Sequence, residues 1–259
     1  MPDFKEKVAV ITGASSGIGA GTAVEIVKQG CSKLVITGRD SESLKRTEQS
    51  CKAIKQDIEV LKLSLDLTDE KAADQLVTTT IEKFGKLHIL VNCAGIVVTG
   101  NVIDTPLQSY DRVMNINVRS IVQLTQLCLP HIIKTQGSIV NVSSINGICS
   151  FAGVSYYCMT KSALDMFTKC LALEMAPHNV RVNSVNPSVI KTNIHKRMGM
   201  DEEEYAKFLE HSKTTHALGR VGEVEEVAKA ICFLASSDAS FTTGQLLRVD
   251  GGRGIISPR

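Results

Sequence analysis

Short aliphatic and β-branched runs alternate with longer stretches of helical character along nearly the whole chain. The runs expected to be strands are 8–11, 34–36, 60–63, 89–91, 138–142, 180–185 and 246–249. Several of these runs are apolar at every position, which is typical of parallel strands covered by helices on both faces. The stretches expected to be helices are 17–29, 41–55, 69–84, 106–134, 154–176 and 224–236. This alternation predicts an α/β fold with a doubly wound, seven-stranded, mostly parallel sheet.

The composition is that of an ordinary globular protein. The 259 residues are 43% hydrophobic and 22% charged, with a net charge of +2. No segment has the basic density that nucleic acid or an anionic membrane surface requires, and no apolar run is long enough to span a bilayer. The first residues lack a signal-peptide core, so a cytoplasmic location is expected. No linker divides residues 1–259, which are expected to form one domain, and the eight cysteines lack metal-site spacing, so no metal is expected.

Tyr157 and Lys161 stand four residues apart in a stretch expected to be helical, and Ser144 stands thirteen residues before the tyrosine. Positions i and i+4 share one face of a helix, so the phenol and the ammonium are expected to be neighbours. A nearby cation favours the phenolate, so Lys161 is expected to lower the pKa of Tyr157. Tyr156 lacks a lysine four residues later, which leaves Tyr157 as the candidate proton donor.

A glycine-rich turn follows the first expected strand, with the pattern G-x-x-x-G-x-G over residues 13–19. Glycines let a pyrophosphate approach the backbone closely, and the N-terminus of the next helix offers free N–H groups to the anion. The turn is therefore expected to bind the phosphates of a dinucleotide. The residues expected to do so are Gly13, Ser15, Ser16, Gly17, Ile18 and Gly19.

The end of the second expected strand favours NADP(H) over NAD(H). An acidic residue there binds the ribose 2′-hydroxyl of NAD, whereas a basic residue accommodates the 2′-phosphate of NADP. Gly38 stands where the carboxylate is expected, and Arg39 follows with a guanidinium suited to phosphate. Asp40 would serve NAD(H) if the turn were shifted by one residue, so NAD(H) stays a possible cofactor.

These motifs resemble the short-chain dehydrogenase/reductase family, in particular its 3-oxoacyl carrier protein reductases, tropinone reductases and glucose dehydrogenases. The resemblance extends from residue 5 to about 252. It implies a single Rossmann domain, a substrate lid at about 191–217 and a homotetramer, or less often a dimer, packed through the helices expected at 106–134 and 154–176. The motifs that carry it lie at 12–19, 66–68, 92–95, 115–118, 143–144, 157–161, 186–187, 243–245 and 249–252.

The resemblance also implies a role for each catalytic candidate. Tyr157 would be the acid/base, and Lys161 would hydrogen-bond the nicotinamide ribose. Ser144 would hydrogen-bond the substrate oxygen and stabilise negative charge that develops on it. Asn117 would kink its helix and hold a water in a proton relay to Lys161. The further cofactor contacts implied are Asp66 and Leu67 at the adenine, Asn92, Ala94 and Gly95 along the adenosine ribose and fourth strand, Tyr157 and Lys161, and Pro187, Val189 and Thr192 at the nicotinamide side.

Two positions depart from the family pattern. Cys93 replaces an asparagine, which is expected to be a tolerated structural change. Ser188 replaces the glycine of a Pro-Gly pair after the sixth strand, and is expected to alter the loop or to intrude on the pocket.

The sequence therefore predicts an NADP-dependent oxidoreductase that interconverts a small-molecule carbonyl and a secondary alcohol by hydride transfer. Two alternatives stay open: a 3-oxoacyl-thioester reductase of fatty acid metabolism, and a nucleotide-binding redox sensor without turnover. Neither a nucleic acid nor a membrane is expected as a partner.

Overall fold

The computed structural model describes residues 4–192, 194 and 199–256, and its seven strands form one sheet in the order β3-β2-β1-β4-β5-β6-β7. Every neighbouring pair is parallel, so the sheet predicted as mostly parallel is parallel throughout. The strands are β1 (Val8–Ile11), β2 (Lys33–Gly38), β3 (Glu59–Ser64), β4 (Ile89–Asn92), β5 (Ser138–Val142), β6 (Arg181–Pro187) and β7 (Leu246–Val249).

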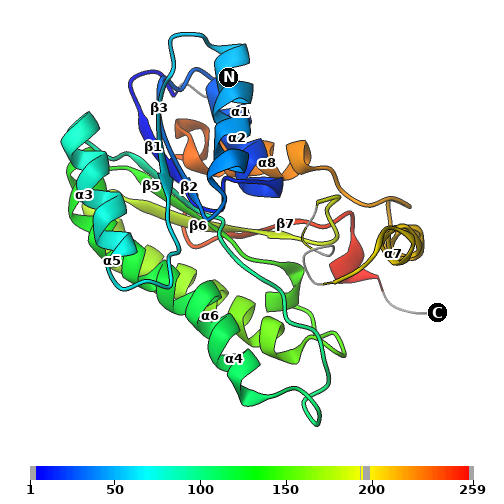
Figure 1. Ribbon diagram of the computed structural model, residues 1–259. Coiled ribbons are helices and arrows are strands. Elements are labelled where there is room, and N and C mark those ends of the chain that lie inside the picture. Colours follow the sequence, from blue (N-terminus) through cyan, green and yellow to red (C-terminus); the bar gives the residue numbers. More distant parts are fainter. Residues whose placement is uncertain (1–3, 193, 195–198, 257–259) are drawn as a thin grey trace.

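Helices cover both faces of the sheet (Figure 1). One face packs against α1 (Gly17–Lys28), α2 (Ser41–Ile54) and α8 (Val224–Ala235), with Ile26, Leu44 and Ile231 in a shared apolar core. The other face packs against α3 (Ala72–Phe84), α5 (Ser120–Thr135) and α6 (Ser155–Met175), where Leu76, Leu124 and Leu171 form the second core. Strands β1, β4 and β5 are buried at every residue, which explains the unbroken apolar runs at 8–11 and 89–91.

Two expected helices differ from the structure. The helix expected from residue 69 begins at Ala72, because Asp69 instead accepts a hydrogen bond from the backbone N–H of Lys71 at 2.9 Å in a turn before the helix. The helix expected over 106–134 consists of α4 (Leu107–Met114), a π-helical turn (Asn115–Arg119) and α5. A π-turn is one residue wider than an α-turn, and residue propensities do not reveal it.

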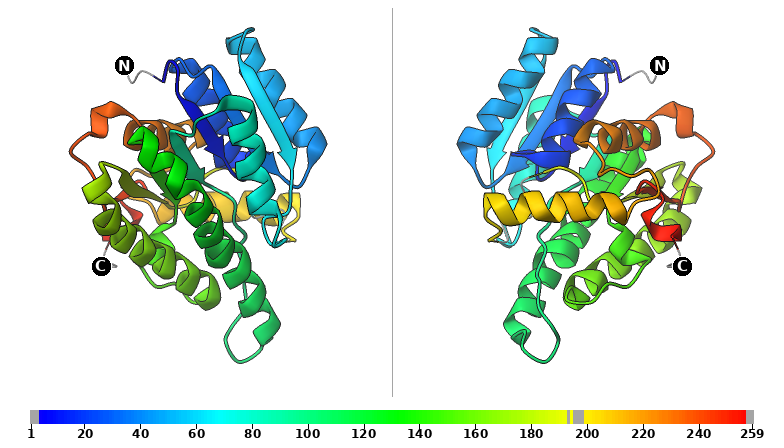
Figure 2. Two further views of the ribbon diagram at one scale, coloured as in Figure 1. Left: turned by 90° about the vertical axis from the view of Figure 1, so that its left-hand side faces the viewer. Right: turned by 90° about the vertical axis from the view of Figure 1, so that its right-hand side faces the viewer.

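The segment expected to be the lid contains α7 (Glu202–Thr214), and the acidic residues of its first turn stabilise the start of the helix. Asp201 and Glu204 form a capping box at its start, each side chain bonding the backbone N–H of the other residue. Figure 2 shows α7, drawn in gold, crossing the molecule beside the carboxyl ends of the strands. Residues 193 and 195–198 of this segment lie outside the described residues.

Within the described ranges, no helix combines the length and the apolar character needed to cross a membrane. All eight cysteines are free thiols, and Cys31, Cys51, Cys128 and Cys232 are buried, in accordance with a role as small apolar side chains.

Candidate active site

The predicted site residues gather where the parallel strands end. The glycine-rich turn follows β1, Arg39 follows β2, and Asp66 follows β3. Ser144 comes two residues after β5, and β6 ends at Pro187. In a doubly wound sheet, ligands bind at this carboxyl edge. The topology therefore collects residues that are far apart in sequence into one region.

Ser144 and Tyr157 lie next to one another. Ser144 caps a short helical turn after β5, where its hydroxyl accepts a hydrogen bond from the backbone N–H of Asn146 at 3.2 Å. Tyr157 lies in the first turn of α6, close enough for the Ser144 hydroxyl to favour its phenolate form. A substrate oxygen placed between these hydroxyls could be hydrogen-bonded by both.

Lys161 lies one turn further along α6, almost fully buried, with its Nζ 5.6 Å from the centre of the Tyr157 ring. The ammonium donates a hydrogen bond to the carbonyl of Val142 at 2.9 Å. Burial lowers the pKa of Lys161 to about 8, because the charged form loses its hydration, and the neighbouring Asp165 carboxylate opposes this only in part.

The expected lowering of the pKa of Tyr157 is wrong for this arrangement. Burial raises the pKa of Tyr157 to about 12, and the hydrogen bond from Ser144 offsets only part of this. Desolvation of the phenolate prevails because the Lys161 ammonium is directed at a backbone carbonyl rather than at the phenol oxygen. At neutral pH the phenol therefore keeps its proton.

Asn117 lies fully buried in the π-helical turn between α4 and α5. Its Oδ1 accepts the N–H of Ile96 at 2.9 Å, while its Nδ2 donates to the carbonyl of Ile96 at 2.9 Å and to the hydroxyl of Thr160 at 3.1 Å. It thus joins the segment after β4 to α6, beside Lys161. A Cβ at Gly95 would lie 3.3 Å from Asn117 Oδ1 and 3.8 Å from Lys161 Nζ, so glycine leaves room between them.

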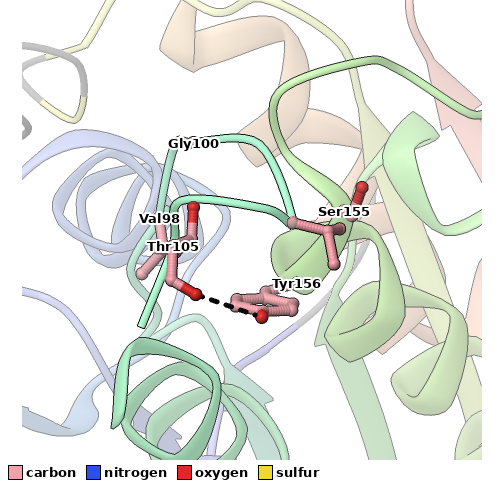
Figure 3. Close-up of a pocket in the computed structure, with 6 residues that line it drawn as sticks. Val98, Gly100, Thr105, Ser155 and Tyr156 are labelled. Carbon is pink, nitrogen blue, oxygen red and sulfur yellow. Dashed lines mark hydrogen bonds between the residues drawn. The ribbon is translucent and has the colours of Figure 1, made fainter. Parts of the chain in front are cut away.

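Tyr156 has a different use from Tyr157. Its hydroxyl donates to the carbonyl of Thr105 at 3.3 Å, and its ring meets that of Tyr110 edge-on, with 5.5 Å between the ring centres. Figure 3 shows this side chain beneath the loop that carries Gly100 and Thr105, where it lines a shallow pocket. Tyr156 therefore fastens this loop to the start of α6.

The glycine-rich turn packs closely against the segment after β4. Gly13 has a φ of +65°, and a Cβ there would lie 2.9 Å from the backbone of Ala94. The N-cap residue of α1, Ser16, makes no side-chain hydrogen bond to the helix, which leaves the positive end of α1 available to an anion. A Cβ on Gly17 would lie 3.4 Å from the Thr192 side chain, so the segment after β6 lies next to this turn.

A cavity that is partly open to solvent extends from the glycine-rich turn to the ends of β2 and β3. Six predicted cofactor residues line it: Gly13, Arg39, Asp66, Leu67, Ala94 and Gly95. The lining residues that the sequence did not single out for this site are Leu65, Thr68, Ile96, Ile116 and Ser120. Asn92 is directed elsewhere, since its amide donates to Thr125 and Asn141 inside the fold at 3.2 and 2.9 Å.

The residues after β2 have distinct partners. Arg39 lies 4.0 Å from the carboxylate of Asp66 across the cavity mouth, and its side chain is exposed. Asp40 is the N-cap of α2 and accepts hydrogen bonds from the N–H and hydroxyl of Ser43 at 3.1 and 2.6 Å. A Cβ on Gly38 would lie 3.0 Å from the Ser15 hydroxyl, so this position has little room for a carboxylate side chain.

Sequence reasoning missed Asp165, a buried carboxylate one turn beyond Lys161. Asp165 accepts from the amide of Asn186 at 3.0 and 3.1 Å, and burial raises its pKa. The Asn186 amide also donates to the carbonyl of Ser144 at 2.9 Å. This network ties α6 to β6 and to the turn that carries Ser144. The i+4 spacing from Lys161 is the sequence signal that could have found it.

Pro187 and Val189 are not among the residues that line this cavity. Pro187 accepts the Ser144 hydroxyl through its carbonyl at 3.3 Å, and Val189 is buried. The described part of the chain contains no group of three or more histidine, cysteine, aspartate or glutamate side chains that could hold a metal ion.

Comparisons with known proteins assign the family. A family model described as enoyl-(acyl carrier protein) reductase matches residues 13–253. The chain is 35% identical to meso-2,3-butanediol dehydrogenase of Serratia marcescens, over 96% of this chain and 95% of that protein. It is 36% identical to 3-oxoacyl-(acyl-carrier-protein) reductase of Thermotoga maritima, over 95% and 97%. A Caenorhabditis elegans short-chain dehydrogenase/reductase of unknown function, solved with cofactor, aligns with a TM-score of 0.92 at 33% identity, over 99% and 98% of the two chains. The chain belongs to the short-chain dehydrogenase/reductase family of oxidoreductases.

Proposed function

We propose that this protein is an NADP(H)-dependent oxidoreductase that interconverts a carbonyl and a secondary alcohol, with Tyr157 as the acid/base. The observation that carries the proposal is the placement of Tyr157 next to Ser144 and one helical turn before the buried Lys161. Membership of a family of dehydrogenases and reductases that use NAD(P)(H) supports it.

In the reductive direction, Tyr157 gives its proton to the carbonyl oxygen while Ser144 hydrogen-bonds the same oxygen. Because burial keeps the phenol protonated at neutral pH, Tyr157 is held in the form that a proton donor needs. The Ser144 hydroxyl stabilises the negative charge that develops on the oxygen. Asn117 holds the segment after β4 in place beside Lys161.

A bound nicotinamide would supply the hydride to the carbonyl carbon or accept it from the alcohol. The glycine-rich turn and the uncapped start of α1 suit the pyrophosphate. Asp66, Ala94 and Gly95 line the cavity in which the adenosine would lie. The contacts of Pro187, Val189 and Thr192 with the nicotinamide side belong to the same proposal.

The preference for NADP(H) rests on three neighbouring residues. Gly38 has no carboxylate for a ribose 2′-hydroxyl, and Arg39 at the cavity mouth could pair with a 2′-phosphate. Asp40, which would serve NAD(H), is committed to the first turn of α2. The Asp66 carboxylate near Arg39 would compete with the phosphate for the guanidinium, so this preference is moderate in size.

Three expectations about organisation are part of the proposal. The first is that α7 and its flanking residues act as the substrate lid. The second is a homotetramer, which exposed apolar side chains at Leu107 on α4 and at Met166 and Leu173 on α6 support. Sedimentation velocity at micromolar concentration tests it. The third is a cytoplasmic location, which fractionation of the source cells tests.

Similarity to the Thermotoga maritima enzyme keeps a 3-oxoacyl-thioester reductase as the second candidate. The test is NADPH consumption at the nicotinamide absorbance band with 2,3-butanedione, a ketose, a bicyclic ketone and an acetoacetyl thioester as substrates. Turnover of the first three supports the small-molecule function, and turnover of the thioester alone supports the second candidate. Tight NADPH binding without turnover of any of them favours the sensor.

Tyr157→Phe tests the acid/base role. We expect turnover to fall about 10²- to 10⁴-fold with nearly unchanged NADPH affinity, because the ring stays and only the proton donor is lost. Tyr156→Phe is the matched control, since its hydroxyl bonds a loop carbonyl, and should retain most of the turnover. Near-normal turnover in Tyr157→Phe would refute the assignment.

A further inference from the structure

Ser188 and His216 form a hydrogen-bonded pair that the proposed chemistry does not use. Ser188 follows the end of β6, and His216 comes two residues after α7. The serine hydroxyl lies 2.5 Å from the Nε2 of the histidine and 3.3 Å from the carbonyl of Asp250. The imidazole is only 3% exposed. Ser188, which stands where the family pattern has a glycine, is thus hydrogen-bonded to a buried histidine of the lid segment.

The other ring nitrogen fixes the direction of this bond. His216 Nδ1 lies 2.6 Å from the carbonyl of Ser212, which can only accept, so Nδ1 carries the proton. The Thr215 hydroxyl lies further from Nδ1, at 3.4 Å. In the neutral imidazole, Nε2 is then an acceptor, and the Ser188 hydroxyl donates to it.

Burial leaves the His216 ring neutral at neutral pH. Burial is the main cause that lowers the pKa of His216, and the neighbouring Arg253 lowers it further. The carbonyl of Ser212 and the carboxylate of Asp250 act in the opposite direction without reversing the shift. The pair is therefore formed in one tautomer, with Ser188 as donor.

A second contact joins α7 to the same stretch of chain. The Tyr205 hydroxyl, from the first turn of α7, donates to the carbonyl of Thr192 at 2.9 Å. The segment 188–192 is thus bonded to the beginning of α7 through Tyr205 and to the residues after its end through His216. Thr192 in turn lies next to Gly17 of the glycine-rich turn. The position of α7 is therefore fixed relative to the proposed nicotinamide side of the site.

We infer that Ser188 and His216 are positioning residues that hold the lid helix α7 in its substrate-binding position, and so determine the KM for the carbonyl substrate without taking part in proton transfer. This inference rests on the proposed function. Removal of the Ser188 hydroxyl leaves a buried imidazole nitrogen without its donor, which favours displacement of the residues after α7.

The variants that test this are Ser188→Ala, His216→Asn and the double variant. Asparagine can keep a donor to the Ser212 carbonyl, but lacks the atom that receives the Ser188 proton. Ser188→Thr retains the hydroxyl and should restore wild-type behaviour. Ser50→Ala removes an exposed serine hydroxyl that bonds only within α2, and is the control.

The first readout is amide hydrogen exchange of α7 in the protein without added ligand, which does not depend on turnover. We expect exchange in α7 to accelerate about 5- to 30-fold in each single variant, with α1 unchanged. The double variant should match the single variants, because each change removes the same bond. The second readout is KM for whichever of 2,3-butanedione, the ketose, the bicyclic ketone and the acetoacetyl thioester is turned over best. It should rise about 3- to 10-fold in each single variant, with kcat within about twofold.

Unchanged exchange in α7 together with unchanged KM would overturn the inference. Equal acceleration in α1 and α7 would also overturn it, since the pair would then contribute only to general stability. If no carbonyl is turned over, the proposed function fails while the exchange experiment still decides whether the pair holds α7.

Discussion

Lys161 provides the most direct test of how strongly burial in this site disfavours a charged side chain. Burial lowers its pKa from the ordinary 10.5 to about 8. At roughly 1.4 kcal/mol per pH unit, this corresponds to about 3 kcal/mol against the charged form in the folded state. Below pH 8 the lysine is charged in both states, and the folded protein bears the whole penalty. Between about pH 8 and 10.5 the folded state has released the proton that the unfolded state still binds, so stability rises with pH.

The perturbation is Lys161→Met, which keeps an unbranched apolar side chain and removes the charge. We expect the free energy of unfolding of the wild type, relative to this variant, to rise by about 3 kcal/mol between pH 7 and 10.5. Loss of the bond to the Val142 carbonyl destabilises the variant by an amount that does not depend on pH, so only the slope is diagnostic. The raised pKa of Tyr157 acts mainly above pH 10, and both proteins contain it.

The assay is urea denaturation followed by circular dichroism at half-unit pH steps, without added NADPH. Lys169→Met, at an exposed position on the same helix, controls for the loss of a lysine as such. A difference between the wild type and Lys161→Met that stays constant within about 0.5 kcal/mol across this range would refute the reasoning that burial controls this ammonium.

Three further predictions concern other parts of the chain. Arg39→Asp should shift the ratio of kcat/KM from NADPH toward NADH by about 1–3 kcal/mol, and an unchanged ratio would show that Arg39 is not the selector. Burial lowers the pKa of His88 to about 4, so the folded state rejects a proton that the unfolded state binds below about pH 6.5. The control variant is His88→Asn, which can still accept a hydrogen bond from the Val8 N–H. In urea titrations, the free energy of unfolding of the wild type should fall by about 3 kcal/mol relative to this variant between pH 6.5 and 4. An equal loss of stability in both proteins would contradict this. Gly13→Ala brings a Cβ to 2.9 Å from the Ala94 backbone at a φ of +65°, and should lower both Tm and NADPH affinity. A Tm equal to that of the wild type would show that the backbone of this turn can relax.

The fold was predictable because its signal is local. Parallel strands buried on both faces require uninterrupted apolar runs, and the run at 8–11 coincides with β1. The ends of elements were less predictable, since they depend on competing hydrogen bonds. Asp69 appeared to start a helix, yet its carboxylate caps a turn three residues earlier than the helix start at Ala72.

The sequence was sufficient to predict which residues form the site, but not the pKa of its tyrosine. Tyr157 and Lys161 share a helix face because of their spacing, which any helical register preserves. The pKa of the phenol depends instead on burial and on the direction of the lysine, which points to the carbonyl of Val142. Similarly, no local pattern connects Ser188 with His216, because their contact exists only after α7 has packed.

The π-turn at Asn115–Arg119 has a consequence for how this site tolerates change. One extra residue in a helix rotates everything after it by about 100°, so α4 contacts α6 whereas α5 contacts α3. The continuous helix formed by α4, the π-turn and α5 thereby packs against α6 in its first part and against α3 in its second part. The change from one neighbour to the other occurs at Asn117. Deleting one residue there would keep this segment helical but turn the apolar stripe of α5 away from α3. The apolar packing of α5 on α3 therefore helps to keep Asn117 beside Lys161. Mutations in either region are thus constrained by the other.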